Sequence, residues 1–383
     1  MPHLPFFLLS FAWNYGLGMS WLAVPLYAHA QGLSGAQIGA LFALPVAAQI
    51  AINLLGGAYV DRVGGRRMML LSCGLLAAAG VELVFARGFW PLIGGQLLLV
   101  VSRASFWPAN WAIATELPGA RGVQVGRLNA VTNLGQILGN ASCGFALATA
   151  GFAASFLLMS ALAILAWALG LRVQGHGARH AGGKSLFANY GRLLRVPLLY
   201  YAMMCAYLSA LPFSLSTSFY PLLLQQFGYG EESSGILVAL RAVGGIAAGL
   251  LVARFVRTGA ASAWPVWSGV AVAFSVGLIS LFPHWAALGA LLLAVGLASG
   301  VMTVYFQMTL SEAAGPEMRG SAMALGGFGW GLSHFSTPLA MGFIADRYGL
   351  VAGFHALGVA ALAVALSIAM LRRWAFASAR LAV

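Results

Sequence analysis

Long apolar segments limit what this sequence can fold into more than any other feature. Twelve of them follow one another with short connections, and a bilayer-spanning helix needs about 20 such residues. They lie near residues 4–29, 36–60, 68–86, 90–114, 122–148, 153–171, 197–226, 233–256, 264–281, 285–310, 320–345 and 350–371. Only 7% of the residues are charged, against roughly 25% in a soluble domain. The sequence therefore predicts an all-α membrane protein with twelve transmembrane helices.

The basic residues predict the orientation of these helices. If both termini and the segment 173–196 are cytoplasmic, 16 of the 20 lysines and arginines lie on that side. Arg87 and Arg347 are then outside, and Arg103 and Arg241 lie within spans. The positive-inside rule thus predicts a multi-pass protein with both termini in the cytoplasm. The net charge of +12 reflects this topology, so we expect no nucleic-acid partner.

The chain is predicted to consist of two similar halves. Residues 173–196 form a glycine-rich basic linker between a six-helix bundle at 1–172 and another at 197–383. At an offset of 196 residues, Pro25, Gly32 and Gly39 align with Pro221, Gly228 and Gly235. At an offset of 198 residues, GFAASF from Gly151 aligns with GLVAGF from Gly349. Two parallel repeats place a solute site near the midplane of the membrane. The repeat therefore favours a transporter over a membrane enzyme.

The connection between the second and third spans carries the most specific pattern. It contains, in order, Gly57, Asp61, Arg62, Gly64, Arg66 and Arg67. This pattern resembles the G-x-x-x-D-R-x-G-x-R-R loop of the major facilitator superfamily (MFS), and the twelve-span layout agrees with that family along the whole chain. The resemblance implies the MFS fold and a loop that latches one conformation. The alternative is that the loop only anchors the topology.

Other stretches resemble this family less closely. The second-half copy of the loop has Arg257 where Asp61 would align. On the fifth span, Asn140 and Cys143 replace residues of the G-P-x-x-G-G pattern of exporters, and Arg103 matches the arginine of the L-x-x-x-R pattern tied to proton coupling in drug antiporters. The resemblance is therefore to drug and metabolite efflux members with degenerate second-half patterns.

Polar and aromatic residues mark the candidate solute site. In the family, the first, fourth, seventh and tenth helices line the cavity. The corresponding spans here supply Asn14, Tyr15, Arg103, Trp107, Asn110, Trp111, Tyr207, Thr303 and Gln307. The four residues from the fourth span share one helix face. The alternative is ordinary hydrogen bonding and packing between helices.

Charged residues inside the membrane narrow the chemistry. An arginine at the bilayer centre costs about 2.5 to 3.5 kcal/mol on insertion scales, so Arg103 and Arg241 are expected to face a cavity or a partner. Glu82 is the one acid well inside a predicted span. We therefore expect Arg103 to meet a carboxylate or phosphate of the solute, with Arg241 as a second candidate. Alternatively, protein groups hold both arginines, and an Arg241–Asn133 contact would serve gating.

A proton-coupled cycle needs a titratable group, and the candidates are Glu82 and His334. Three cysteines inside apolar runs show no metal-ligand spacing, and the sequence lacks a P-loop, an H-E-x-x-H and a G-x-S-x-G pattern. We expect no cofactor, no metal and no enzymatic activity.

The sequence as a whole predicts a secondary active transporter that moves a small amphipathic or anionic organic solute by alternating access. We expect proton-coupled efflux by a monomer in a bacterial inner membrane. The alternatives are uptake of an organic anion by symport or facilitated diffusion, and a non-transporting sensor or scaffold on the same fold.

Overall fold

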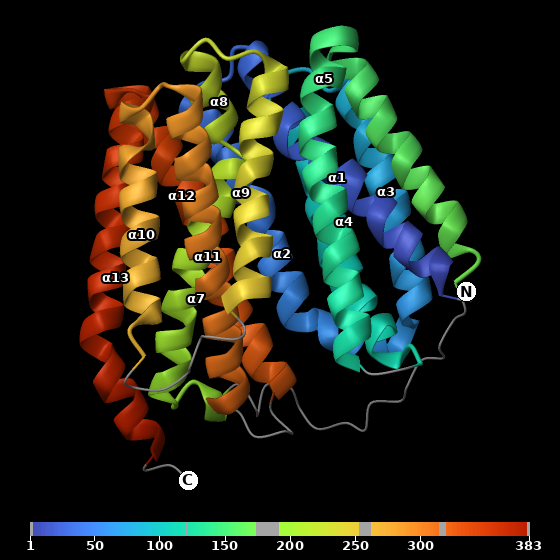
Figure 1. Cartoon of the computed structure of the whole chain (residues 1–383). Coiled ribbons are helices and arrows are strands. Elements are labelled where there is room, and N and C mark those ends of the chain that lie inside the picture. Colours follow the sequence, from blue (N-terminus) through green and yellow to red (C-terminus); the bar gives the residue numbers. More distant parts are fainter. Residues whose placement is uncertain (1–2, 119–120, 174–190, 253–261, 314–318, 381–383) are drawn as a thin grey trace. The chain divides into compact units, whose positions relative to one another are not determined.

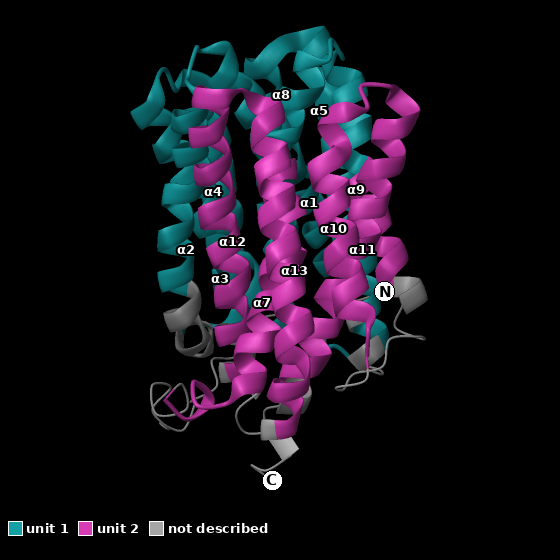
Figure 2. Ribbon diagram, turned by 90° about the vertical axis from the view of Figure 1, so that its left-hand side faces the viewer, with its two compact units in different colours: residues 1–182, 217–239 teal, residues 183–216, 240–383 magenta. Residues whose placement is uncertain are grey.

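A computed structural model describes residues 3–118, 121–173, 191–252, 262–313 and 319–380 (Figure 1). The description covers the backbone alone at 53–62, 115, 121, 122, 125, 250–252, 311–313, 319–321, 323, 324 and 378–380. The chain forms two compact units (Figure 2). The first comprises Met1–Gly182 and Thr217–Ala239, and the second comprises Gly183–Ser216 and Leu240–Val383.

The helices of the first unit come mostly from the first half of the chain. They are α1 (Leu4–Ala30), α2 (Gly35–Val63), α3 (Gly65–Phe85), α4 (Phe89–Glu116), α5 (Arg121–Gly170), α8 (Tyr220–Gln226) and the beginning of α9 (Glu231–Val252). α5 packs against α1 and α3, whereas α4 packs against α3 and α2. α5 contains two of the predicted spans, 122–148 and 153–171. Its backbone turns between them at Gly151, where φ is 78°.

The helices of the second unit surround α7. They are α7 (Pro197–Ser216), the rest of α9, α10 (Trp264–Leu278), α11 (Trp285–Ala313), α12 (Arg319–Tyr348) and α13 (Leu350–Arg380), with a 3₁₀ turn, η1 (Ile279–Leu281), after α10. α7 packs against α11, α12 and α13, and α10 packs against α11 and α13. The large side chains of Tyr201, Tyr305 and Phe354 are fully buried in this unit.

The predicted span at 197–226 is interrupted in the structure. α7 ends at Ser216, a turn covers 217–219, and α8 begins at Tyr220. Pro221 cannot donate a backbone hydrogen bond to Thr217, and its ring would clash with that carbonyl in a continuous helix. Hydroxyl residues just before it also compete for backbone groups. The turn places residues 217–239 in the first unit, and 174–190 of the predicted linker lie outside the described residues. The six-plus-six division remains a prediction.

Glycines allow helices to approach closely within each unit. A Cβ atom at Gly135 of α5 would lie 2.6 Å from the Phe11 carbonyl oxygen of α1, and one at Gly18 would lie 2.8 Å from the Gln136 carbonyl oxygen. In the second unit, a Cβ atom at Gly296 of α11 would collide with the backbone of Arg241. Small residues at such crossings are typical of helix pairs in membranes.

The backbone supports the internal repeat. Gly32 and Gly228, which align at an offset of 196 residues, have φ angles of 76° and 84°. Gly151 and Gly349, which align at 198, have φ angles of 78° and 84°. These are left-handed conformations that glycine adopts readily and other residues avoid. The same turns therefore recur at equivalent places in the two halves of the sequence.

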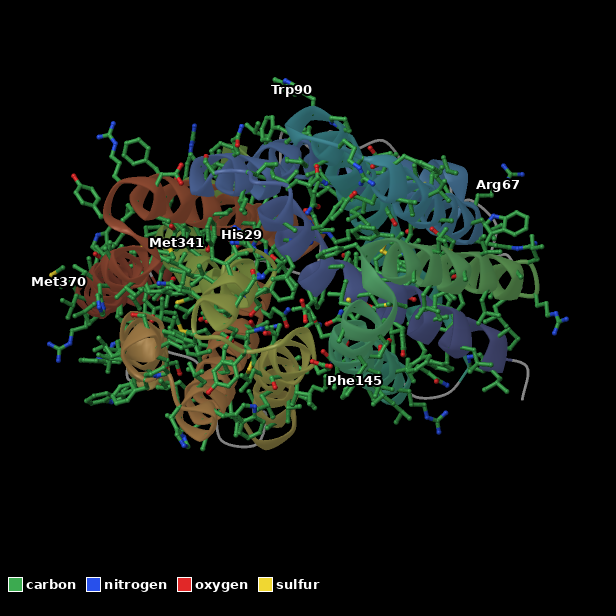
Figure 3. All side chains as sticks on the ribbon, turned by 90° about the horizontal axis from the view of Figure 1, so that it is seen from above. His29, Arg67, Trp90, Phe145, Met341 and Met370 are labelled. Carbon is green, nitrogen blue, oxygen red and sulfur yellow. The ribbon has the colours of Figure 1, made fainter. Side chains whose placement is uncertain are left out.

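Apolar side chains cover much of the surface. Trp90, Phe145 and Met370 are 74%, 51% and 73% exposed, and all three point away from the helices (Figure 3). Eight helical stretches among the described residues are long and apolar enough to cross a membrane, and the one at Gly126–Gly170 contains two predicted spans. Such a surface is suited to lipid rather than to water.

Candidate functional site

Arg103 lies halfway along α4 in the first unit. Its Nη2 atom donates a hydrogen bond to Oε1 of Gln49 on α2 at 3.3 Å, whereas its buried Nε atom has no hydrogen-bond partner among the described residues. Just before it, Ser102 exchanges hydroxyl-to-carbonyl hydrogen bonds of 2.8 Å with Ser72 of α3. These bonds fix the position of α4 beside α3. The guanidinium is thus held by a neutral amide and keeps a free donor.

Glu82 does not neutralise Arg103. Its carboxylate packs against Gly94 and Gly95 of α4, and its buried Oε2 atom has no hydrogen-bond partner among the described residues. Gly95 and Arg103 are eight residues apart, which is about 12 Å along a helix axis. Among the carboxylates whose side chains the structure describes, none forms an ion pair with Arg103.

Aromatic side chains of α1 and α4 pack together in the first unit. The rings of Trp13 and Phe106 stack with centroids 3.7 Å apart, and Trp107 meets Trp13 edge-on at 6.4 Å. Trp107 is half-buried, and it lies one helical turn after Arg103 on the same face of α4. Trp111, one turn further on, is 38% exposed. Trp107 therefore presents an aromatic ring on the same face of α4 as Arg103.

Asn14 and Asn110, the predicted amide residues of the first unit, are buried and form hydrogen bonds with neighbouring helices. Ser10 donates to Oδ1 of Asn110 at 2.9 Å, and Gln136 donates to Oδ1 of Asn14 at 2.8 Å. Asn14 and Asn110 are both 0% exposed. Tyr15 is half-buried, with its ring 5.9 Å from that of Phe11. The hydrogen bonds of Asn14 and Asn110 join α1 to α5 and α4.

The predicted solute residues of the second unit are dispersed. Tyr207 of α7 shares a hydrogen bond of 2.8 Å with Ser336 of α12. Thr303 of α11 donates to the carbonyl of Ser299 in its own helix at 2.9 Å, and Gln307 is exposed. In the described part of the chain, no hydrogen bond joins these three side chains to one another.

Arg241 and His334 belong to one buried cluster in the second unit. The Arg241 guanidinium lies over the Phe213 ring, with Cζ 4.9 Å from the ring centroid. His334 stacks on Trp330 at 3.8 Å and lies 5.3 Å from Phe213, and its Nδ1 atom is 3.1 Å from the Trp330 carbonyl oxygen. Arg241 is 8% exposed and His334 is 4% exposed. Phe213 thus contacts both basic residues, and we call these four side chains the Phe213 cluster.

The candidate gating residues are only partly described. The side chains of Gly57, Asp61 and Arg62 lie outside the described residues, as does Arg257. Gly64 directly precedes α3 with a φ of 89°, and Arg67 points away from the helices (Figure 3). Arg66 donates to the carbonyl oxygens of Gly170 and Leu171 at 3.2 and 2.6 Å. A cation at these last carbonyls of α5 is favourable.

The expected contact between Arg241 and Asn133 stays a prediction. Asn133 belongs to the first unit, where its side-chain amide donates to the Asn129 carbonyl in its own helix at 2.7 Å. Arg241 belongs to the second unit.

Sequence reasoning missed Gln49 and Phe213. Gln49 is one of three amide residues in the predicted span at 36–60, and a search for partners of Arg103 would have found it as a candidate. Phe213 had no such signal, because it is one of 23 phenylalanines in an apolar sequence.

Comparisons with known proteins agree with this architecture. Residues 6–338 match the family model of the Major Facilitator Superfamily. A bacterial homologue of the human lysosomal transporter Spinster has the same fold, with a TM-score of 0.75, 16% identity and coverage of 99% of this chain and 98% of that one. The nucleoside transporter NupG gives a TM-score of 0.78 at 13% identity, covering 98% of this chain and all of that one.

Two curated relatives are named for drug resistance. Multidrug resistance protein 2 of Bacillus subtilis is 30% identical over 160 residues, which are 39% of this chain and 38% of the relative. Quinolone resistance protein NorA of Staphylococcus aureus is 26% identical over 160 residues, 41% of this chain and 40% of the relative. The alignments thus span about two fifths of each relative's length.

These findings define the class of the protein as a multi-pass membrane protein with the fold of known membrane transporters. The chain belongs to the Major Facilitator Superfamily, and the curated relatives above are named for drug resistance.

Proposed function

We propose that this chain exports a small amphipathic or anionic organic solute across the bacterial inner membrane by alternating access, in exchange for protons. The drug-resistance relatives favour export, and the name of NorA suggests quinolones as a starting solute class. A quinolone carries a carboxylate on an aromatic ring system. Arg103 and Trp107 would bind these two parts.

The environment of Arg103 is the observation that carries this proposal. Among the described residues, its positive charge meets one neutral hydrogen-bond acceptor, Gln49, and its Nε atom still has a hydrogen to donate. A guanidinium in an apolar environment is costly unless an anion compensates its charge. A solute carboxylate can accept from guanidinium in a bidentate geometry, which is the strongest form of this hydrogen bond.

The Phe213 cluster supports proton exchange at His334. Arg241 already places one positive charge on the face of Phe213, and His334 lies against the same ring. A proton on His334 adds a second positive charge in buried surroundings, where like charges repel strongly. Protonation of His334 would therefore weaken the position of Arg241, which is a gating candidate. Glu82 is the second proton candidate.

The gating proposal rests on Arg66. Its two hydrogen bonds tie the beginning of α3 to the end of α5, close in sequence to Asp61 and Arg62 at the end of α2. We propose that this fixed arginine holds the α2–α3 connection in place while a latch opens and closes. The latch residues are Gly57, Asp61, Arg62, Gly64 and Arg67.

Transport by everted membrane vesicles tests the function and the role of Arg103 together. The solutes are a fluorescent quinolone and its methyl ester, which lacks the carboxylate charge. The variants are Arg103→Ala and the control Arg87→Ala, whose arginine is exposed. We expect wild-type vesicles to accumulate both solutes. Arg103→Ala should lower the ratio of quinolone accumulation to ester accumulation at least tenfold, because only the carboxylate of the quinolone needs the guanidinium.

The outcomes separate the two parts of the proposal. Equal losses for the acid and the ester in Arg103→Ala would refute anion binding by Arg103. No accumulation of either solute by wild-type vesicles would refute quinolone export.

A further inference from the structure

Five polar side chains meet inside the second unit, where α7 begins and α11 and α13 approach their ends. We call them the hydroxyl cluster; they are Tyr201, Ser262, Tyr305, Thr309 and Arg372. The Tyr201 and Tyr305 rings lie edge-to-face with centroids 6.4 Å apart. The Tyr305 hydroxyl lies near those of Tyr201, Ser262 and Thr309, but none of these three forms a hydrogen bond of ordinary geometry with it. Arg372 donates from Nη1 to the Ser262 carbonyl oxygen at 2.8 Å.

Several polar atoms of the hydroxyl cluster lack hydrogen-bond partners. Among the described residues, no partner is found for the buried Oη of Tyr201, Oγ of Ser262, Oγ1 of Thr309 or Nε of Arg372. Tyr201 is 1% exposed and Thr309 is 0% exposed. Buried polar atoms in native proteins are almost always satisfied, and unsatisfied ones call for a water or an ion. Four such atoms in one place indicate a shared ligand.

The chemistry of these atoms favours an anion. Each hydroxyl group can donate one hydrogen bond, and the Nε atom of Arg372 can only donate. Arg372 has no ion pair with a carboxylate in the part of the chain that the structure describes. A tetrahedral phosphate has several acceptor oxygens that point in different directions, and arginine binds phosphate with charge-assisted hydrogen bonds.

The surroundings place the cluster near the lipid headgroups. Ser262 and Arg372 are half-buried, whereas the three other members are buried, so the cluster is open on the side of Ser262 and Arg372. Trp264 and Trp374, two residues after these, are 43% and 55% exposed. Tryptophans are enriched at the membrane interface, and basic residues near a predicted cytoplasmic face attract anionic lipids.

From these observations we infer that the hydroxyl cluster is a phosphate-binding site, which takes the headgroup phosphate of an anionic phospholipid or free phosphate. Arg372 neutralises the charge, and Tyr201, Ser262 and Thr309 donate to the phosphate oxygens. This site is independent of the proposed transport site, because it uses none of the residues assigned to solute or protons.

Thermal unfolding of the purified full-length protein in detergent tests this inference. One arm adds inorganic phosphate against chloride at equal ionic strength, and the other adds phosphatidylglycerol against phosphatidylcholine. The variants are Arg372→Gln, Tyr201→Phe and Thr309→Val, with Arg373→Gln as the control because Arg373 is adjacent and exposed. We expect a rise of the unfolding midpoint by a few degrees in wild type and Arg373→Gln, because a ligand stabilises the state that binds it.

The variants decide whether the cluster carries this effect. The rise should vanish in Arg372→Gln and fall by at least half in Tyr201→Phe and Thr309→Val. A rise with phosphatidylglycerol alone identifies a lipid headgroup, and a rise with inorganic phosphate identifies the free ion. No rise in either arm, or the same rise in all variants, would overturn the inference. If Arg372→Gln does not fold, the two variants that each remove only a hydroxyl group give the same decision.

Discussion

A guanidinium inside an apolar helix bundle needs partners. Arg103 and Arg241 have different kinds of neighbour. Arg103 donates to an amide oxygen of Gln49, whereas Arg241 lies over the ring of Phe213. The sequence could predict that both arginines need a partner, since charge in a bilayer is costly. It could not predict which partners, because these come from helices that are distant in sequence and set by packing.

At His334, we predict that removal of the titratable ring uncouples transport from the pH gradient. His334→Gln should still exchange solute at equal pH on both sides, and it should lose most of the stimulation by an imposed gradient. The reason is that glutamine cannot add a positive charge beside Arg241 and Phe213. Transport by reconstituted protein with and without a gradient measures this, with His284→Gln as the exposed control.

A wild-type response to the gradient in His334→Gln would exclude this histidine as the coupling group. If Glu82→Gln then abolished the response, the proton site would be Glu82, whose Oε2 atom has no hydrogen-bond partner among the described residues.

At the scale of the helices, close crossings depend on glycine. α1 and α5 approach so closely at Gly135 and Gly139 that a Cβ atom would collide with the backbone of α1. The sequence predicted the helices well, because a span is defined by its own apolar length. It did not predict the interruption at 217–219, which arises from the local chemistry of hydroxyl residues and Pro221.

For this crossing we predict that Gly139→Ala destabilises the protein and that Gly126→Ala does not. Both glycines lie in α5, but a Cβ atom at Gly126 meets nothing within 4 Å, whereas one at Gly139 meets the Tyr15 carbonyl oxygen. Overpacking costs typically 1 to 3 kcal/mol, so the unfolding midpoint of Gly139→Ala should fall by several degrees. Alanine at Gly126 should leave the midpoint unchanged or raise it slightly, since alanine favours helix.

Thermal unfolding in detergent, followed by circular dichroism, compares the two variants. Equal midpoints for Gly139→Ala and wild type would show that α1 and α5 do not depend on the close crossing.

At the scale of the whole molecule, the family and its fold were predictable from sequence. The superfamily was indicated by the twelve apolar segments, the residue pattern at 57–67 and the internal repeat. The family model matches residues 6–338. The placement of 217–239 with the first unit was not predictable, because it depends on packing of residues 217–239 against helices from the first half of the sequence. The predicted solute residues lie on helices of both units, as expected for residues from the first, fourth, seventh and tenth spans.

One measurement tests the direction of transport and its coupling to protons most directly. Purified protein is reconstituted in liposomes, and uptake of a fluorescent quinolone is followed under an imposed pH gradient, with protein-free liposomes as the control. Proton-coupled export predicts accumulation against the concentration gradient when the interior is acidic, and its collapse on addition of a protonophore. Accumulation driven only by an alkaline interior, or uptake that is the same with and without a gradient, would contradict the account.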